Sequence, residues 1–450
     1  VRLPAIIGNH MVLLRNSTIK IWGWADPYER VTVKPDWDTS TYSAIGSSGA
    51  TFEINIKTGA DGNKHSIIIK GHNTILIEDV VFGEVWICSG QSNMEMNMNW
   101  GMPMYAADAE KATNDKMRFF YIPKKTSLFP QDDVTAQWVV CTPAEMKNFS
   151  VVGYFFGDRL QTNLHTAIGL INSNWGGTPA EVWTPSYLIE QDTALRKMTT
   201  ELKPNAGWPV IPGATYNAMI NPVTKFNISG AIWYQGEANV GTWYGYTHLL
   251  NAMITSWRTE WKKDLPFYFV QIAPFAGYGK GNAAALLREA QTKAAASVSN
   301  TGMVVVSDLV DNINDIHPKL KKPVGLRLAD YALVKTYGFN LQSYRSPNYD
   351  HMKIEKNKIQ IFFDQVPTTL KSTDKSITGF FIAGEDKNFV PADAKIEGKS
   401  VIVWSKDVKQ PIAVRFGFTN DSMPNLFTSE GLPVNLFRTD NWDAISTVNK

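Results

Sequence analysis

The chain has 450 residues, of which 44% are hydrophobic and 19% charged, with 15 Trp, 16 Tyr, 22 Phe and a formal net charge of +2. At ~100–200 residues per domain, this length predicts two or three domains, and the apolar content excludes a disordered chain. The basic residues are scattered and no apolar stretch reaches the ~20 residues of a membrane-spanning helix, so we expect neither a nucleic-acid partner nor a membrane span.

The cysteines and the start of the chain bear on compartment and cofactors. The chain begins at Val1 without Met, so we expect that a leader has been removed and that the protein is periplasmic or secreted. Cys88 and Cys141 lie in apolar, strand-like stretches and are expected to be buried free thiols rather than a disulfide. No metal-type spacing of His, Glu or Cys occurs, so we expect no metal and no cofactor. Nothing in the sequence indicates an oligomeric state.

Three segments of different texture follow one another along the chain. Residues 1–80 contain short β-type runs such as TIKIWGW, ERVTV and SIIIK, separated by turns. Residues 81–345 alternate apolar strand-like runs with helical stretches, which predicts a three-layer α/β domain with a parallel sheet covered on both faces. Residues 346–450 return to short strands. This last β-rich segment either folds by itself or packs with the N-terminal strands.

The strand candidates of the middle segment are EVWICSG, MRFFYIP, AIGLINSNWGG, ISGAIWYQGE, LPFYFVQIAPF and GMVVVSD. The helix candidates are VGYFFGDRLQTNL, YTHLLNAMITSWRTEW, ALLREAQTKAAASV and PVGLRLADYALVKTY. In open parallel sheets, ligands bind beyond the carboxyl ends of the strands. Four polar stretches follow predicted strands in this way: Ser89–Met94, Asn174–Thr178, Gln235–Glu237 and Asn314–Pro318.

A hydroxyl and an imidazole stand out among these residues. Ser92 falls where a strand turns into a helix, a position at which a hydroxyl can meet substrate, although an ordinary helix N-cap serine also fits there. His317 is the only one of the seven histidines that follows a sheet strand in such a loop, and a neutral imidazole can accept a proton near neutral pH. Asp315 or Asp311 could orient the ring.

Donors for an oxyanion are also present. The Ser92 amide, the Gly177 amide and the Gln235 side chain would make a three-donor oxyanion hole. A turn at Gly176 and Gly177 and a strand-end cap at Gln235 are the plain structural alternatives. Trp100, Trp175, Trp183 and Trp243 lie near the motifs, where each could present an apolar face to a sugar, although a Trp in such a domain is more often core or rim.

The combination of motifs resembles one known family. Gly90-Gln91-Ser92-Asn93-Met94, Asn174 to Glu181 (NWGGTPAE), Trp233 to Glu237 (WYQGE) and Asp315-Ile316-His317-Pro318 look like the sialate O-acetylesterase family of SGNH hydrolases. The opening LPAIIGNHMVLLRN and the later ITGFFIAGEDKNFVPADAKIEG are also similar to that family, so that the resemblance covers nearly the whole chain.

The resemblance implies an α/β/α catalytic domain of SGNH (flavodoxin-like) type flanked by β-rich segments. It implies Ser92 as nucleophile, His317 as base, and oxyanion donors from Ser92 and Gly177, with Gln235 where the superfamily often has Asn. Many members place the triad Asp three residues before the His, but that residue is Asn314 here. The resemblance therefore favours Asp315, and a Ser-His dyad remains an alternative. Asn93 and Glu237 are expected to hold the turn and Gln235.

The expected function is hydrolysis of O-acetyl esters on sugars through an acyl-enzyme, with O-acetylated sialic acid first and acetylxylan or another polysaccharide as the alternative. Two other classes compete with it. Glu181 and Glu237 could form the carboxylate pair of a glycosidase. A noncatalytic carbohydrate-binding protein built on β-rich segments is the second rival.

Overall fold

The computed structural model describes residues 1–444, which form two compact units. The first unit comprises Val1–Tyr234 and Leu249–Phe267, and the second comprises Gln235–His248 and the chain from Tyr268 onward. The motif residues predicted from the sequence are divided between the two units. The division into three domains predicted from the sequence stays a prediction.

The N-terminal segment of the first unit consists of short antiparallel strands, as predicted. One pair is formed by β2 (Thr18–Trp24) and β5 (Thr51–Lys57), and β3 (Arg30–Pro35) lies between β4 (Tyr42–Ile45) and β6 (His65–Lys70). Buried and exposed residues alternate along β5, which is the two-residue period of a half-buried strand.

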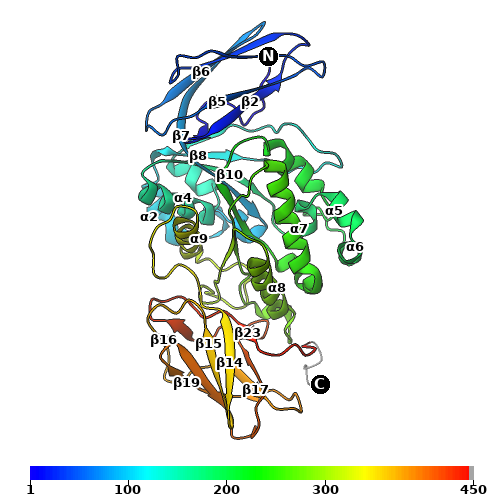
Figure 1. The fold of residues 1–450 in the computed structure, drawn as a ribbon, viewed down its shortest axis with the longest axis vertical. Coiled ribbons are helices and arrows are strands. Elements are labelled where there is room, and N and C mark those ends of the chain that lie inside the picture. The colour runs from blue at the N-terminus through cyan, green and yellow to red at the C-terminus, as the bar shows by residue number, and fades with distance from the viewer. Residues whose placement is uncertain (445–450) are drawn as a thin grey trace. The chain divides into compact units, whose positions relative to one another are not determined.

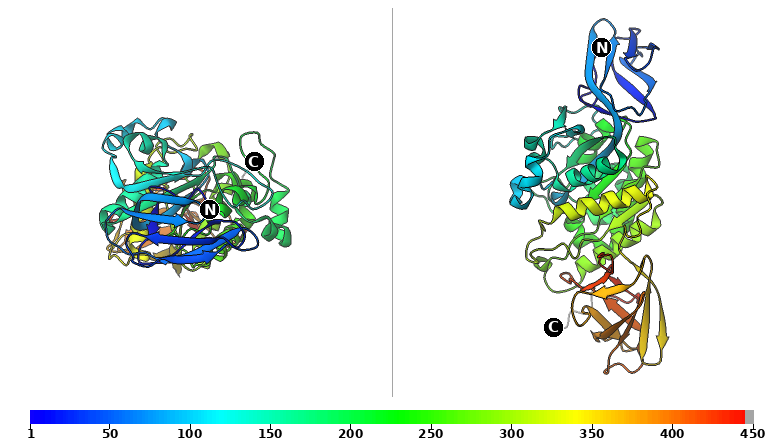
Figure 2. Two further views of the ribbon diagram at one scale, coloured as in Figure 1. Left: turned by 90° about the horizontal axis from the view of Figure 1, so that it is seen from above. Right: turned by 90° about the vertical axis from the view of Figure 1, so that its left-hand side faces the viewer.

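Strand β7 (Thr74–Gly90) belongs to two sheets. Its first half pairs antiparallel with β6, and its second half pairs in parallel with β10 and β11. Figure 2 shows this strand running from the N-terminal strands into the central sheet. The burial changes at the same place, because every residue from Val80 to Gly90 is buried. Residue 80, the predicted domain boundary, therefore lies inside a continuous strand.

The central sheet of the first unit confirms the α/β prediction. Its strand order is β11-β7-β10-β8-β9, and all neighbours are parallel except β9, which runs antiparallel to β8 at the edge. The short β1 also pairs in parallel with β7. The bounds of these strands are β1 (Val12–Leu14), β8 (Asn114–Tyr121), β9 (Trp138–Cys141), β10 (Ala167–Asn174) and β11 (Gly230–Tyr234).

Both faces of this sheet are covered. On one face Trp86 of β7 packs edge-on against Phe156 of α4 (Val151–Leu164). On the other face Trp233 of β11 packs against Trp183 and Trp257, the latter on α7 (Trp243–Trp261). These tryptophans are all buried. A layer of helical residues on each face explains why the strands are almost continuously apolar in the sequence.

The second unit combines two further strands with two helices and the C-terminal strands. Helices α8 (Ala283–Ser297) and α9 (Lys321–Lys335) both contact β13 (Thr301–Val304). Beyond the end of β12 (Phe267–Val270), the Gln271 amide donates to the Val304 carbonyl at 3.0 Å. These elements match the strand and helix candidates of the sequence.

The C-terminal strands form their own sheets (Figure 1). One sheet has the order β14-β15-β20-β19, a second β18-β17-β21-β23, and β16 pairs with β22. Their inward side chains share one core, with Ile361, Val403, Ile382 and Phe416 among its members. The bounds are β14 (Tyr349–Glu355), β15 (Lys358–Phe363), β16 (Leu370–Ser372), β17 (Phe380–Ala383), β18 (Val390–Pro391), β19 (Asp393–Glu397), β20 (Ser400–Trp404), β21 (Ala413–Phe416), β22 (Leu426–Thr428) and β23 (Phe437–Arg438).

Helix α8 fastens these strands within the second unit. Arg438 forms a two-pronged ion pair with Glu289 of α8 at 2.8 and 3.0 Å, and the fully buried Arg288 donates to the Thr419 carbonyl. Further short helices are α1 (Ser92–Glu95), α2 (Ala106–Glu110), α3 (Pro143–Asn148), α5 (Ser186–Gln191) and α6 (Thr193–Thr199). Across residues 1–444, no helix combines the length and apolar character needed to cross a bilayer.

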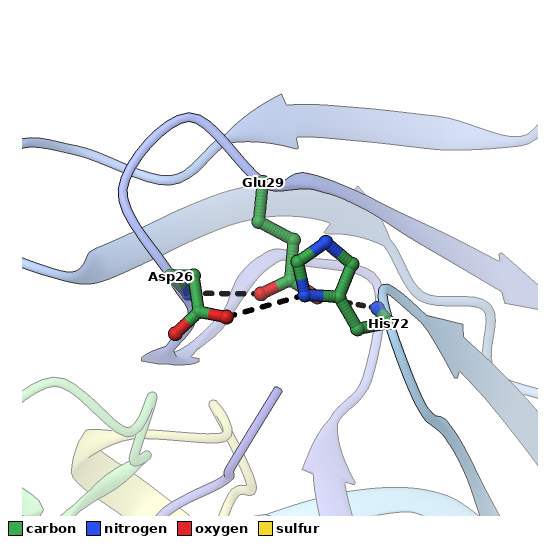
Figure 3. Close-up of side chains that lie close together, drawn as sticks. All are labelled: Asp26, Glu29 and His72. Atoms are coloured by element: carbon green, nitrogen blue, oxygen red, sulfur yellow. Dashed lines mark hydrogen bonds and ion pairs between the residues drawn. The ribbon is translucent and has the colours of Figure 1, made fainter.

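The two cysteines are free and buried, as expected. Burial raises the pKa of both thiols, that of Cys141 to about 12. Three potential metal ligands, Asp26, Glu29 and His72, lie together in the N-terminal segment (Figure 3). Glu29 accepts hydrogen bonds from the backbone amides of Asp26 and His72, and this ties two turns together. The group therefore has a structural explanation.

Candidate active site

The candidate site begins where three parallel strands end at the same level. Gly90 of β7 is in register with Asn174 of β10 and with Tyr234 of β11. The ladder continues one step further, because the Gln91 amide donates to the Tyr234 carbonyl at 2.9 Å and the Trp175 amide donates to the Gly90 carbonyl at 3.0 Å. The motif residues that follow these strands therefore start from one sheet edge.

The turn into Ser92 requires glycine at position 90. Gly90 has φ +134°, and a Cβ there would lie 2.2 Å from the Tyr234 carbonyl oxygen. Ser92 is the first residue of the short helix α1 (Ser92–Glu95) and is 8% exposed. The N-cap is Gln91 and makes no side-chain cap bond, so Ser92 is not the ordinary N-cap serine that the sequence also allowed. Asn93, on the same turn, is fully buried.

The glycine loop lies directly against Ser92. A Cβ on Gly176 would lie 3.3 Å from the Ser92 Cβ, so the absent side chain leaves space beside the serine. The Gly176 amide donates to Glu95 Oε2 at 2.6 Å, and the other Glu95 oxygen accepts from Lys124 Nζ at 2.5 Å. Glu95 was not predicted from the sequence as a site residue. Its position three residues after Ser92, on the same helix turn, is the signal that could have indicated such a role.

Gly177 is held in a left-handed conformation under an aromatic ring. Its φ is +80°, and a Cβ there would lie 2.3 Å from ring carbons of Trp208. The neighbouring Trp175 donates its Nε1 to the Gly207 carbonyl at 3.2 Å. The loop is closed internally by Thr178 Oγ1, which donates to the Trp175 carbonyl at 2.7 Å. Trp208 was not singled out in the sequence, because it lies in a polar, proline-containing stretch.

The other tryptophans and Glu181 separate into core and surface. Trp183 is fully buried and donates to Thr178 Oγ1, so it cannot present a face to a sugar. Trp243 packs against a small core cluster, Trp175 is half-buried and Trp100 is exposed. Glu181, one of the two carboxylates considered for a glycosidase, is fully buried.

In the second unit, Gln235 is fixed at both ends of its side chain. Its Nε2 donates to Asn239 Oδ1 at 2.7 Å, and its Oε1 accepts from the Tyr246 hydroxyl at 2.8 Å. Gln291 of α8 donates to the Gln235 carbonyl at 3.1 Å. Gln235 is fully buried.

The support of Gln235 comes from residues that the sequence analysis did not name. Asn239 lies on the 3₁₀ turn Glu237–Thr242, and Tyr246 lies on the first turn of α7. Both are buried. Glu237 is 8% exposed and begins the same 3₁₀ turn. Its expected role in holding Gln235 stays a prediction.

His317 and Asp315 lie in one loop before α9. Asp315 Oδ1 accepts the backbone amide of His317 at 2.9 Å and lies 3.8 Å from the ring Nδ1. This second distance is an ion-pair distance rather than a hydrogen bond. Asp311, the alternative acid, accepts the Lys319 amide at 3.0 Å. The loop thus places Asp315 beside the imidazole and uses Asp311 for its own closure.

A buried lysine influences the imidazole. Lys321, at the start of α9, is 1% exposed, and this burial lowers its pKa to about 7, while Glu237, Asp311 and Asp315 oppose the shift. Burial lowers the pKa of the His317 imidazole below its ordinary value, the charge of Lys321 lowers it further, and Asp315 opposes both. His317 is therefore neutral around pH 7, the form that can accept a proton.

A family model for carbohydrate esterases, described as sialic acid-specific acetylesterase, matches residues 82–333, which is more than half of the chain. The chain belongs to this family.

Similar proteins agree with this family. The chain is 34% identical to a carbohydrate acetylesterase from Xanthomonas citri of known structure, with a TM-score of 0.89 over 98% of this chain and 100% of that one. It is 28% identical over 417 residues to the sialate O-acetylesterase of Rattus norvegicus, covering 77% of this chain and 75% of the relative. The Homo sapiens sialate O-acetylesterase is 27% identical over 398 residues, covering 79% and 75%.

Membership of this family establishes the type of reaction. The protein is a carbohydrate O-acetylesterase, hence a carboxylic ester hydrolase, and its substrate is an acetylated carbohydrate. This decides against the glycosidase and the noncatalytic binding protein that the sequence left as rivals. The match also covers the α/β region in which all four motifs lie.

Proposed function

We propose that this acetylesterase works through a serine acyl-enzyme, with Ser92 as nucleophile and His317 as general base. In the first step Ser92 Oγ forms a bond to the acetyl carbon while His317 takes the hydroxyl proton. The tetrahedral intermediate then releases the sugar oxygen, which takes that proton from His317. Water, deprotonated by His317, attacks the acetyl-enzyme, and acetate leaves with Ser92 reprotonated.

The observation that carries this proposal is the register of the strand ends. Gly90, Asn174 and Tyr234 are aligned, so that Ser92 and the Gly176-Gly177 loop meet at one sheet edge. Gln235 is the next residue after Tyr234 in the chain. We propose the amides of Ser92 and Gly177 and the side chain of Gln235 as the oxyanion donors, each worth ~10²–10³ in rate when lost. Asn93 and Glu237 would keep the turn and Gln235 in place.

The nucleophile is tested by Ser92→Ala, assayed for acetate release from an aryl acetate and from an acetylated sugar. We expect kcat to fall by at least ~10³ on both substrates, because no acyl-enzyme can form. Ser186→Ala is the matched control. Like Ser92, Ser186 is the first residue of a short helix whose N-cap residue makes no side-chain hydrogen bond. Full activity of Ser92→Ala would disprove the proposal.

The convergence of Ser92 and His317 is tested by crystallography of the enzyme inhibited with a phosphonate. We expect the phosphorus to be bonded to Ser92 Oγ. We also expect the His317 ring to lie within hydrogen-bond distance of that oxygen. In parallel, His317→Gln should be inactive, while His351→Gln, which alters an exposed histidine of β14, should be fully active. A His317 ring turned away from the adduct would refute its role as base.

A further variant distinguishes a Ser-His-Asp triad that includes Asp315 from a Ser-His dyad. We propose that Asp315 orients the His317 ring, since it is the carboxylate beside Nδ1. Asp315→Asn should then reduce kcat by up to ~10⁴, as expected when an orienting carboxylate is lost from a triad. A loss below about tenfold, with an unchanged thermal midpoint, would instead indicate a Ser-His dyad.

For substrate and location, the family description and the names of the curated relatives favour O-acetylated sialic acid, and acetylated xylan is the alternative. We propose a periplasmic or secreted enzyme, because an acetylated glycan from outside the cell would meet the enzyme there. Acetate release compared across O-acetylated sialic acids, acetylated xylan and aryl acetates identifies the sugar. Fractionation of the natural host with an antibody tests the location.

A further inference from the structure

A cavity of about 600 Å³ lies next to the glycine loop, within the first unit. This volume is in the ~300–1,000 Å³ range of small-molecule sites. Two loop segments form its walls, one at residues 126–128 and one at residues 204–214. The lining residues are Thr126, Ser127, Leu128, Pro204, Asn205, Trp208, Pro209, Val210, Ile211 and Ala214.

One residue borders both the cavity and the glycine loop of the candidate active site. Trp208 lines the cavity, and its ring packs on Gly177, where a Cβ would lie 2.3 Å away. The next glycine of the loop, Gly176, lies against Ser92. A molecule in the cavity is therefore separated from the nucleophile by the Trp208 ring and two glycines.

Both walls are held in place by hydrogen bonds. The Ser127 amide donates to the Ala214 carbonyl at 3.0 Å, and Asn217 Nδ2 donates to the Ser127 carbonyl at 3.1 Å. Trp175 Nε1 donates to the Gly207 carbonyl. The two loops thus brace each other and the glycine loop, so the cavity does not have to be formed at the moment of binding.

The lining combines apolar surface with neutral polar groups. Leu128, Trp208 and Ile211 are 69%, 36% and 55% exposed, whereas large apolar side chains are usually withdrawn from water. Thr126, Ser127 and Asn205 add hydroxyl and amide groups. Among the described residues that line the cavity, none carries a charge. A pyranose ring offers the matching surface, with C–H bonds on its faces and hydroxyls at its edge.

We propose that this cavity is a glycan subsite, which holds a neutral sugar next to the acetylated one, with its face on Trp208. The lining offers no charged side chain to an acidic sugar, so this subsite favours the polysaccharide alternative of the proposed function over free O-acetylated sialic acid. This inference rests on the proposed function for its link to catalysis. The binding of sugar itself does not depend on Ser92.

Calorimetric titration with unacetylated xylotetraose and cellotetraose tests the subsite. We expect one of the two to bind the wild-type protein, and to bind Trp208→Ala about tenfold more weakly or worse. Ile211→Ser should weaken binding by a smaller factor. Phe129→Ala is the matched control, because Phe129 is an exposed aromatic residue that follows the other wall segment, residues 126–128, and does not line the cavity.

Sialyllactose and free sialic acid are titrated in parallel. Tighter binding of either acidic ligand than of the neutral tetrasaccharides overturns the proposal, and so does equal binding of the neutral sugars by wild type and Trp208→Ala.

A kinetic readout complements the titration. For Trp208→Ala, the ratio of kcat/KM on an acetylated oligosaccharide to kcat/KM on an aryl acetate should fall about tenfold. An unchanged ratio contradicts the subsite.

The two proposals fail in different experiments. If Ser92→Ala keeps its activity while neutral oligosaccharides bind through Trp208, the serine mechanism is wrong and the subsite stands. If Ser92→Ala is inactive while Trp208→Ala binds these sugars normally, the mechanism stands and the subsite is wrong.

Discussion

Ser92 and its glycine loop are placed by close backbone approaches that leave no room for side chains, whereas Gln235 and His317 are held by contacts with polar side chains. On the nucleophile side, Gly90, Gly176 and Gly177 allow strands and loops to approach closely. On the base side, Gln235 is held by Asn239 and Tyr246, and the His317 backbone amide donates to Asp315. The first kind of construction is sensitive to added volume, and the second to changes of charge and hydrogen bonding.

The largest effect is therefore expected from a single added methyl group on the nucleophile side. Gly90→Ala combines φ +134° with a Cβ 2.2 Å from a backbone oxygen, so β7 and β11 must separate. We expect the free energy of unfolding to fall by ~3 kcal/mol or more, with loss of activity. Gly101→Ala, where φ is +77° and nothing lies within 4 Å, is the control for backbone strain alone. Denaturant unfolding of both variants measures their free energies of unfolding. Equal values for the two variants would contradict the claim that added volume at Gly90 is the cause.

An intermediate effect is expected from an isosteric change on the base side. Gln235→Glu keeps the shape but replaces the Nε2 donor that contacts Asn239. If Gln235 stabilises the oxyanion, kcat should fall by ~10²–10³ while KM changes little. The double variant Gln235→Glu, Asn239→Ser distinguishes the structural contact between these two side chains from donation by Gln235 to the oxyanion. Recovery of kcat in the double variant would mean that Gln235 acts only as part of the scaffold.

The smallest effect is expected from the buried cation. Burial lowers the pKa of His317, and below pH 7 the charge of protonated Lys321 lowers it further, so activity in the wild type should persist to a lower pH than an ordinary histidine base allows. Lys321→Met removes this charge. The acidic limb of kcat/KM should then shift to higher pH, which a pH-rate profile measures. A limb that stays in place, or shifts to lower pH, would show that Lys321 does not act on His317.

Sequence patterns predicted site residues where a loop follows a recognisable apolar run. They did not predict residues that lie outside such a pattern. The apolar runs before Ser92, Asn174, Gln235 and His317 predicted which loops follow sheet strands, because buried parallel strands are uniformly apolar. Lys321 carries no such signal, since a lysine in the first turn of a helix is usually solvated. Its burial depends on packing between segments distant in the sequence, which no local pattern encodes.

The supports of the site were missed for a similar reason. Asn239 and Tyr246 follow Gln235 by four and eleven residues, but their spacing matches no motif, and only the folded path brings them to one amide. Trp208 was missed because its neighbours, Pro204, Asn205 and Pro209, are typical of an ordinary surface loop. Tryptophans beside the motifs drew attention instead, and one of them, Trp183, proved to be core.

The path of β7 has a consequence for how the protein can be cut and recombined. The same seventeen residues pair with β6 at one end and lead directly to Gly90 and Ser92 at the other. Excising residues 1–80 would remove the half of β7 that pairs with β6, and it would also remove β1, which pairs with Val81–Gly83. The N-terminal strands are thus no transferable module, because an enzyme shortened in this way would begin with the unpaired first residues of the strand that leads to Gly90 and Ser92.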